Sequence, residues 1–179
     1  MQRTTVEIAW RAPGEIDQAE ERALRTVFDE VADEFVPPLT VRSTTTQKSL
    51  NGASEPEGTF YFDQMRLQHN LLLFVAGKLQ GFLSFLPSYR DSRLPCADAC
   101  LYVSTIAVRP SARGRGYARL LYERLFALPD TLPAWVVLRT WSTNVGHIRL
   151  LEALGFEVML TIPDDRGEGI HTLYLGRQR

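Results

Sequence analysis

The residues whose types and spacing suggest chemistry gather in the stretch from Tyr102 to Leu121. Its first part, up to Val108, is apolar and rich in β-branched residues, which predicts a buried strand. Pro110 cannot donate to a sheet ladder, so the strand should end before it. Apolar residues then recur at helical spacing from Tyr117 onward. The stretch therefore predicts a strand, a glycine-rich loop and a helix.

The loop between this strand and this helix has the composition of an anion-binding cradle. The first backbone amides of a helix have no partner inside it and lie at the positive end of its dipole. Gly114 and Gly116 carry no side chain that would keep an anion away. Arg113 and Arg115 add charge and forked donors. The loop therefore predicts a pyrophosphate site.

Two common phosphate-binding motifs do not fit this loop. The triphosphate motif G-x-x-x-x-G-K-[ST] is absent, which argues against a nucleotide triphosphatase. The dinucleotide motif G-x-G-x-x-G begins with Gly114 and Gly116 but meets Arg119 where its third glycine belongs. The nearest acidic residue, Asp130, lies in a predicted turn and not at the distance of a ribose ligand. The ligand should therefore be another pyrophosphate compound.

The remaining pattern, Arg113-x-x-Gly116-x-Ala118 preceded by I-A-V-x-P, resembles the acetyl-CoA signature R/Q-x-x-G-x-G/A of the GNAT superfamily of N-acetyltransferases. A second stretch, N-V-G-H-I-R-L-L-E-A-L-G-F, predicts a helix that starts near Asn144 and ends at Gly155. The corresponding helix of the superfamily begins with asparagine and ends in L-Y-E-x-L-G-F. Both motifs occur in the superfamily's order and at its usual separation, so the chain resembles this superfamily.

The resemblance implies acetyl-CoA as co-substrate and assigns residues to it. Main-chain groups of Ile106, Ala107 and Val108 would pair with the pantetheine arm and orient the thioester. Asn144 would hydrogen-bond the arm from the other side, and its side chain or that of Ser142 can also cap the helix. The pyrophosphate would be held by the loop and the first helical turn, which comprise Arg113, Gly114, Arg115, Gly116, Tyr117 and Ala118.

The proton-transfer groups common in the superfamily are missing from their usual places. The tyrosine of L-Y-E-x-L-G-F is Leu151 here, and the strand glutamate of many members corresponds loosely to Tyr102. His147 follows Asn144 by three residues on the same predicted helix face, and histidine can carry protons near neutral pH. His147 and Tyr102 are therefore the candidate catalytic residues, with a packed imidazole and a packed tyrosine as the structural alternatives.

Three other arrangements stay open for the acceptor side. Glu168 and His171 can line the acceptor pocket, and a water relay needs no dedicated base. The first predicted helix carries an acidic face that either attracts a cationic amine or only faces solvent. That face consists of Asp29, Glu30, Asp33 and Glu34.

Composition narrows the class of protein. The 179 residues suffice for one core, so we expect a single domain over residues 1–179. With 20 basic and 21 acidic side chains, the chain has no general attraction to nucleic acid or to anionic membranes. No apolar run reaches the length of a membrane span, and the N-terminal residues lack a signal-peptide pattern. Cys96 and Cys100 have no further ligands nearby, so we expect reduced thiols, no metal site and a cytoplasmic protein.

The periodicity predicts a mixed sheet of about seven strands with helices on both faces, hence an α/β fold. The resemblance adds that the two central parallel strands splay apart around the cofactor. We expect strands over Thr4–Trp10, Leu71–Ala76, Leu79–Leu86, Tyr102–Val108, Trp135–Trp141, Phe156–Ile162 and Gly169–Leu175, helices over Ile16–Phe35, Thr59–Gln68, from Tyr117 to before Pro129, and from Asn144, loops over Thr40–Gly58 and Pro87–Ala97, and a hairpin turn at Gly77-Lys78.

The sequence therefore predicts an N-acetyltransferase that moves an acetyl group from acetyl-CoA directly to a primary amine of a small molecule or amino-acid derivative. The alternative is an acyl-CoA-binding sensor or regulatory module without catalysis, which the missing tyrosine favours. A nucleic-acid module built on Arg109, Arg113, Arg115 and Arg119 is disfavoured by the overall charge. A homodimer is common in the superfamily, although no residue here indicates one.

Overall fold

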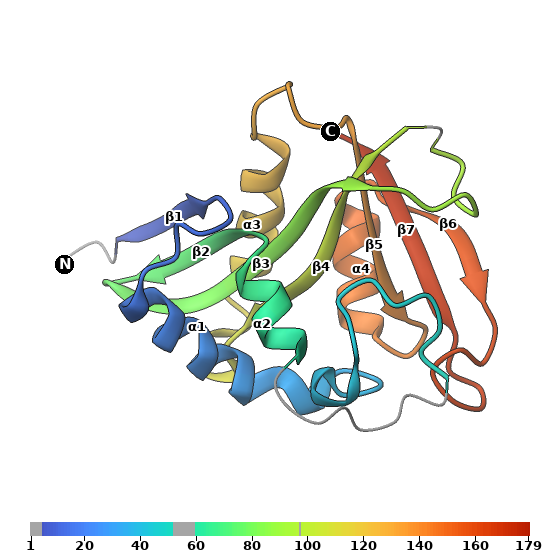
Figure 1. Cartoon of the computed structure of the whole chain (residues 1–179), viewed down its shortest axis with the longest axis horizontal. Helices are drawn as coiled ribbons and strands as arrows, with labels where there is room; N and C mark the ends of the chain where they lie inside the picture. The colour runs from blue at the N-terminus through green and yellow to red at the C-terminus, as the bar shows by residue number, and fades with distance from the viewer. Residues whose placement is uncertain (1–4, 52–59, 97) are drawn as a thin grey trace.

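The chain was analysed as a computed structural model, which describes residues 5–51, 60–96 and 98–179. One mixed sheet in the order β1-β2-β3-β4-β5-β7-β6 runs through it (Figure 1). The predicted α/β fold is confirmed. The strands are β1 Val6–Arg11, β2 His69–Val75, β3 Lys78–Tyr89, β4 Cys100–Val108, β5 Trp135–Trp141, β6 Glu157–Ile162 and β7 Thr172–Gln178.

Helices cover both faces of this sheet, as predicted (Figure 1). The helices are α1 Gln18–Val31, α2 Phe60–Arg66, α3 Tyr117–Phe126 and α4 Val145–Ala153, with short 3-10 turns at Ala32–Glu34, Leu39–Val41 and Pro110–Ala112. Successive strand residues point to opposite faces. Leu71 and Leu73 of β2 therefore pack with α3 and α4, and Leu72 packs with α1 and α2. In the described part of the chain, no helix is long and apolar enough to cross a bilayer.

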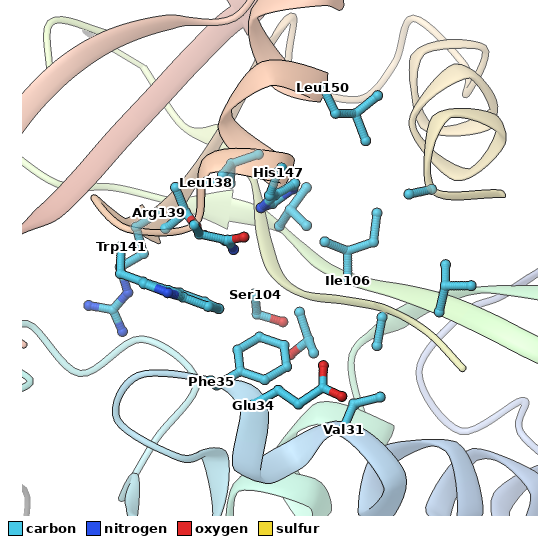
Figure 2. Close-up of a pocket in the computed structure, with 18 of the residues that line it drawn as sticks. Val31, Glu34, Phe35, Ser104, Ile106, Leu138, Arg139, Trp141, His147 and Leu150 are labelled. Atoms are coloured by element: carbon cyan, nitrogen blue, oxygen red, sulfur yellow. Dashed lines mark hydrogen bonds between the residues drawn. The ribbon is translucent and has the colours of Figure 1, made fainter. Parts of the chain in front are cut away.

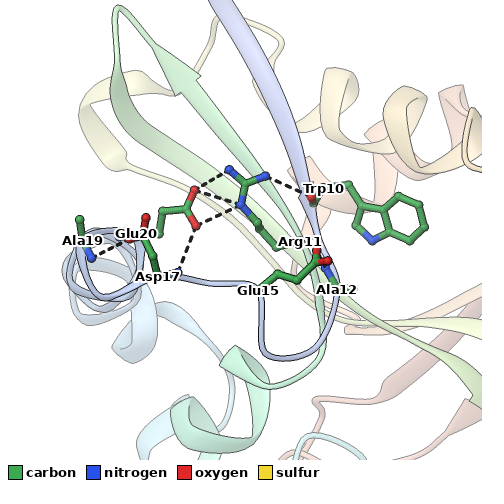
Figure 3. Close-up of polar contacts among 7 residues, drawn as sticks. All are labelled: Trp10, Arg11, Ala12, Glu15, Asp17, Ala19 and Glu20. Carbon is green, nitrogen blue, oxygen red and sulfur yellow. Dashed lines mark hydrogen bonds and ion pairs between the residues drawn. The ribbon is translucent and has the colours of Figure 1, made fainter.

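Helix α1 is fixed to β1 at its first turn (Figure 3). The Asp17 carboxylate accepts hydrogen bonds from the backbone N–H groups of Ala19 (2.7 Å) and Glu20 (2.8 Å). Glu20 reaches back to the backbone N–H of Asp17, which completes a capping box. The same Glu20 carboxylate accepts from Nε and Nη2 of Arg11 at 3.1 and 2.7 Å. This contact joins the end of β1 to the start of α1. The 3-10 turn that follows α1 ends at Glu34, a residue of the candidate site.

The β2–β3 hairpin turns one residue earlier than predicted. Val75 pairs with Lys78, so the two turn residues are Ala76 and Gly77 and not Gly77 and Lys78. Both have positive φ, 49° for Ala76 and 73° for Gly77. Two successive positive φ values give the turn that matches the twist of the flanking strands, and this requirement sets the position.

Strand β3 continues through Pro87 to Tyr89, so the prediction of a loop from Pro87 was wrong for this part. The register shifts between Leu86 and Tyr89. A proline without an N–H group is tolerated at such an irregularity, which is why it does not end the strand. Residue 97, the last of the predicted loop, lies outside the described residues.

Other predicted boundaries shift by a few residues. The first helix ends at Val31 and is followed by the 3-10 turn Ala32–Glu34, where the prediction ran to Phe35. The 40–58 loop begins within the 3-10 turn Leu39–Val41, and its residues 52–58 lie outside the described residues, as does residue 59. The last strand begins at Thr172 because residues 163–171 form turns.

The two central strands pair only over a short distance. Parallel β4 and β5 are paired at Leu101–Val136, Tyr102–Val137 and Val103–Leu138. Beyond these pairs β4 runs on to Val108 and β5 to Trp141, and the strands separate. The predicted parallel pairing and the predicted splay are both confirmed, and the splay leaves one edge of β4 without a strand partner.

The close packing of β3 on β4 makes a stability prediction. A Cβ placed on Gly81 would lie 2.7 Å from the carbonyl oxygen of Ala107 and 3.1 Å from Cγ2 of Val108. Gly81→Ala must push β4 away, and we expect a loss of about 1–3 kcal/mol in the free energy of unfolding. The matched control is Gly146→Ala in the first turn of α4. A Cβ there meets nothing within 4 Å, so alanine should stabilise the helix by roughly 0.5–1 kcal/mol. Denaturant unfolding of both variants measures this, and equal effects would contradict the prediction.

Candidate active site

A cavity of about 690 Å³ occupies the opening between β4 and β5 (Figure 2). It extends from Arg113 and Gly114 in the loop before α3 to Trp141 at the C-terminal end of β5 and Phe35 after α1. Its lining residues are Val31, Glu34, Phe35, Arg42, Val103, Ser104, Thr105, Ile106, Ala107, Val108, Arg113, Gly114, Ala118, Tyr122, Leu138, Arg139, Thr140, Trp141, Asn144, Gly146, His147, Leu150 and Arg166. Of the predicted site residues, Ile106, Ala107, Val108, Arg113, Gly114, Ala118, Asn144 and His147 meet here, and Tyr102, Arg115, Gly116 and Tyr117 do not line it.

The unpaired edge of β4 presents main-chain groups to this cavity. The N–H of Arg109 donates to the backbone carbonyl of Gln80 in β3 at 2.8 Å. Main-chain direction alternates along a strand, so Ser104, Ile106 and Val108 point away from β3. Two contacts agree with this direction, since Ser104 O accepts from the Tyr61 hydroxyl (3.0 Å) and Val108 O accepts from Arg113 Nε (3.1 Å). Ile106 lies between them and offers both its N–H and its C=O to a ligand lying along the edge.

The predicted cradle is formed by the loop that ends at the N-terminus of α3. Gly114 and Gly116 have φ of 75° and 79°, and a Cβ on either would project into open space. Their requirement for glycine is therefore the left-handed backbone. The N–H of Leu120 donates to Gly116 O at 3.1 Å, so the amides that precede it have no acceptor inside the helix, and no side chain caps them. An anionic group fits this set of unpaired donors.

Two arginines near the cradle are bound to carboxylates of α1 and of the 3-10 turn that follows it. Arg113 Nη2 lies 2.6 Å from Glu34 Oε2. Arg109 Nε donates to Glu30 Oε2 at 3.0 Å. Glu30 is thus paired with Arg109, and Glu34 with Arg113. A pyrophosphate at the cradle would share the Arg113 guanidinium with Glu34.

His147 and Tyr122 form a buried pair between α4 and α3. The Tyr122 hydroxyl and His147 Nε2 share a hydrogen bond of 2.9 Å, and both residues line the cavity. Burial lowers the pKa of His147 to about 4, so its imidazole is neutral at pH 7. Burial also raises the pKa of Tyr122 above its usual value, which keeps the hydroxyl protonated. Sequence reasoning missed Tyr122, because it lies in the apolar stripe of α3 and belongs to no motif.

Tyr102 and Asn144 differ in how they relate to the cavity. Tyr102 is 1 % exposed and stacks on Tyr89 with ring centroids 4.3 Å apart, and burial raises its pKa to about 12. Asn144 lines the cavity, and its Nδ2 donates to Thr140 Oγ1 at 3.1 Å. It is the N-cap residue of α4 but forms no side-chain cap bond, so the expected capping by its side chain was wrong. Ser142 Oγ instead accepts from the backbone N–H of His171 at 3.0 Å.

The end of the cavity far from the cradle is aromatic and basic. Phe35 and Trp141 have ring centroids 5.6 Å apart and lie together there (Figure 2). Arg42, Arg139 and Arg166 line the cavity at this end. Sequence reasoning missed all five residues, because they come from separate segments and no spacing connects them. Glu168 and His171, which were open candidates for this end, do not line the cavity.

The fold and the site define a class of protein, an acyltransferase with an open strand edge for a pantetheine arm and a helix N-terminus for its pyrophosphate. The profile of the acetyltransferase (GNAT) family matches residues 24–156. The chain belongs to this family. It is an acyl-CoA-dependent N-acetyltransferase, and its co-substrate is acetyl-CoA.

Solved structures with the same fold agree at low sequence identity. A GNAT-family acetyltransferase of Bacillus cereus is 13% identical with a TM-score of 0.67, and 98% of each chain is covered. The acetyltransferase yncA of Salmonella typhimurium, solved with acetyl-CoA, is 18% identical with a TM-score of 0.64, covering 99% of this chain and 94% of that one. A ribosomal-protein-alanine N-acetyltransferase of Brucella melitensis is 16% identical with a TM-score of 0.66, covering 96% and 99%. No curated protein sequence matches the chain.

The structure suits acetyl-CoA, which supplies an acetyl group activated as a thioester. The cradle before α3 would hold its pyrophosphate, and the free edge at Ile106 and Val108 would bind its arm. Asn144 faces that edge from the start of α4, across the opening between the strands. For the individual residues these assignments are predictions.

Cofactor affinity should depend on the left-handed glycine that starts α3. Gly116→Ala forces an alanine into φ near 79°, which costs about 1–2 kcal/mol or shifts the loop. We expect at least tenfold weaker acetyl-CoA binding by calorimetry. Gly14→Ala is the matched control, because Gly14 also has positive φ (85°) and open surroundings but lies in the turn between β1 and α1, whereas Gly116 is the N-cap of α3. Equal loss of affinity in both variants would contradict the cradle assignment.

The buried imidazole should make stability depend on pH. The pKa of His147 is about 4 in the folded chain and about 6.5 when unfolded. The unfolded chain therefore binds the extra proton as pH falls from about 6.5 to about 4, and stability falls over that window. His147→Gln keeps a hydrogen-bonding partner for Tyr122 but does not titrate, so its unfolding free energy should fall less between pH 7 and pH 4.5. Identical pH profiles of the two proteins in urea unfolding would show the prediction wrong.

Proposed function

We propose that the chain transfers the acetyl group of acetyl-CoA directly to the primary amine of a small molecule or amino-acid derivative. The observation that carries the proposal is the continuity of the cavity. One space connects the cradle residues Arg113 and Gly114, the free edge at Ile106, and the aromatic end at Phe35 and Trp141. An acyl donor entering from the cradle would bring its thioester to the middle and leave the far end for an acceptor.

Direct attack is favoured because the hydroxyl in the middle of the cavity is not activated. Ser104 lines the cavity, and its Oγ donates to Gln68 Oε1 at 2.6 Å. An amide oxygen cannot take up the proton that a nucleophilic serine must lose. Cys96 and Cys100 do not line the cavity, and burial raises the pKa of the Cys100 thiol to about 12. Neither Ser104 nor the cysteines are activated nucleophiles, which supports the proposal that the amine attacks directly.

A small acceptor is favoured by the segment that lies over the far end. Arg139 Nη1 donates to the backbone carbonyl of Gln47, and the backbone N–H of Leu50 donates to Asp165 Oδ1 at 3.1 Å. These contacts hold the segment of residues 43–51 against the strands that carry the cavity. A protein N-terminus, which the Brucella relative is named for, would have to enter beneath it.

His147 is our proposal for the group that takes the proton from the amine. It lines the cavity and is neutral at pH 7, and in the tautomer whose Nε2–H donates to the Tyr122 hydroxyl its Nδ1 carries a free lone pair. Tyr102, the other candidate from sequence, has no access through the cavity lining. A water relay remains the alternative to His147. The cytoplasmic location and a homodimer stay predictions.

Two measurements test the proposed function. Calorimetric titration should show tight binding of acetyl-CoA and no comparable binding of ATP or NAD. With acetyl-CoA bound, a panel of small primary amines should then give amine-dependent release of the coenzyme A thiol at steady state. Equal binding of all three nucleotides would refute the cofactor assignment, and binding without release across the panel would favour the sensor alternative.

A further inference from the structure

Three arginines, of which two are buried and Arg139 is partly buried, meet at the aromatic end of the cavity with little negative charge to balance them. Arg42 is 4 % exposed and Arg166 is 7 % exposed, and Arg139 reaches the same end from β5. Burial, together with the charges of Arg42 and Arg139, lowers the pKa of Arg166 to about 9. Within residues 5–51, 60–96 and 98–179, none of the three forms an ion pair with a carboxylate.

The carboxylate next to Arg166 in the sequence, that of Asp165, is already occupied. Its Oδ2 accepts from Thr172 Oγ1 at 2.6 Å, and its Oδ1 accepts from Ser49 Oγ (3.4 Å) and from the backbone N–H of Leu50 (3.1 Å). The charge of Asp165 raises the pKa of Arg166, but burial and the charges of Arg42 and Arg139 lower that pKa by more. One carboxylate and three guanidinium groups leave this end of the cavity positive.

Neutral acceptors satisfy only part of the three guanidinium groups. Arg42 donates to Pro37 O through Nε (3.1 Å) and Nη2 (2.8 Å). Arg166 donates to Thr172 Oγ1 through Nε (2.9 Å) and to Val36 O through Nη1. Arg139 donates to Gln47 O through Nη1.

One nitrogen on each of two arginines remains unsatisfied. The Nη2 atoms of Arg139 and Arg166 are buried and have no hydrogen-bond partner in the described part of the chain. Buried donors are nearly always paired in native proteins, so a missing partner needs an explanation. Both residues line the cavity, so a ligand there can become the partner of these nitrogens when the guanidinium groups turn toward it.

We propose that the acceptor amine carries a carboxylate and that Arg139 and Arg166 bind it through these two nitrogens. This inference rests on the proposed N-acetyltransferase function and names the class of its acceptor, an amino acid or related amino carboxylic acid. A carboxylate has one oxygen for each unpaired nitrogen, and guanidinium groups match its planar geometry. Arg42 adds positive charge beside them. Phe35 and Trp141 form an apolar wall for the rest of the acceptor.

The same charge distribution selects against amines without an anionic group. A protonated amine that enters this end meets three like charges in a poorly solvated space, where repulsion is strong. A carboxylate on the acceptor cancels part of this charge and fixes the amine on the side of the β4 edge. The arginines therefore act both by attraction and by exclusion.

The test measures binding without requiring turnover. Coenzyme A is first added to saturation, so that the cradle is filled, and thermal unfolding is followed with N-acetyl amino acids and their N-acetyl carboxamides. The acids are analogues of the product, and each amide differs only in the missing negative charge. We expect the best acid to bind about ten- to a hundredfold more tightly than its amide. Equal binding of acid and amide, or tighter binding of an O-phosphorylated analogue, would overturn the proposal.

Variants locate the effect. Arg139→Met and Arg166→Met should reduce the acid preference to near one, while Arg124→Met on α3, outside the cavity lining, should keep it. The acid–amide comparison in the unchanged protein stands even if a variant fails to fold.

A second control concerns carboxylates of the chain itself. Glu55→Gln combined with Glu57→Gln changes carboxylates outside the described residues. An acid preference that appears only in this double variant would mean that the arginines serve the chain's own carboxylates, and would refute the proposal.

The result can be separated from a failure of the proposed function. Acetyl-CoA binding and thiol release with simple amines are measured on the same protein. Release with uncharged amines at rates equal to those with amino acids would keep the acetyltransferase proposal and reject the carboxylate. No acetyl-CoA binding would reject the proposed function, whereas the acid preference is read from unfolding temperatures alone.

Discussion

The early end of the pairing between β4 and β5 is the constraint on which the site depends. Only three residue pairs hold the two strands together before they separate. The separation places a free strand edge inside the molecule, where its N–H and C=O groups need partners. The Tyr61 hydroxyl and the Arg113 guanidinium satisfy Ser104 and Val108, and the groups of Ile106 between them are left for a ligand. Cofactor binding thus supplies what the sheet lacks.

Charge is arranged in opposite ways at the two ends of the cavity. At the cradle, Arg109 and Arg113 are paired with Glu30 and Glu34, so a pyrophosphate that binds Arg113 competes with a carboxylate. At the aromatic end, the arginines contact backbone carbonyls, which offer dipoles but no charge. The first arrangement makes an anion compete for its arginine, and the second leaves the positive charge in place. This contrast favours binding of the acetyl donor at the cradle end and of the amine acceptor at the aromatic end of the same cavity.

Much of the fold could be predicted from the sequence because local rules decide it. The continuous apolar run of residues 71–76 predicted β2, and the glycine-rich loop marked the start of α3. The position of the hairpin turn was missed, because the requirement for two positive φ values at Ala76 and Gly77 is a property of strand twist. The Tyr122–His147 pair and the arginines were missed for a deeper reason. Each residue is unremarkable in its own segment, and only tertiary packing brings Arg42, Arg139 and Arg166 together.

The segment over the acceptor end is attached partly through its main chain. Arg139 binds the carbonyl of Gln47, and Asp165 binds the N–H of Leu50. These two anchors use main-chain atoms of Gln47 and Leu50, whereas Thr45 and Ser49 attach the segment through their hydroxyl groups. Substitution at Gln47 can therefore change the surroundings of the acceptor end while the main-chain anchor, the strands and the cradle stay unaltered. That separation offers a route to redesigning selectivity without rebuilding the cofactor site.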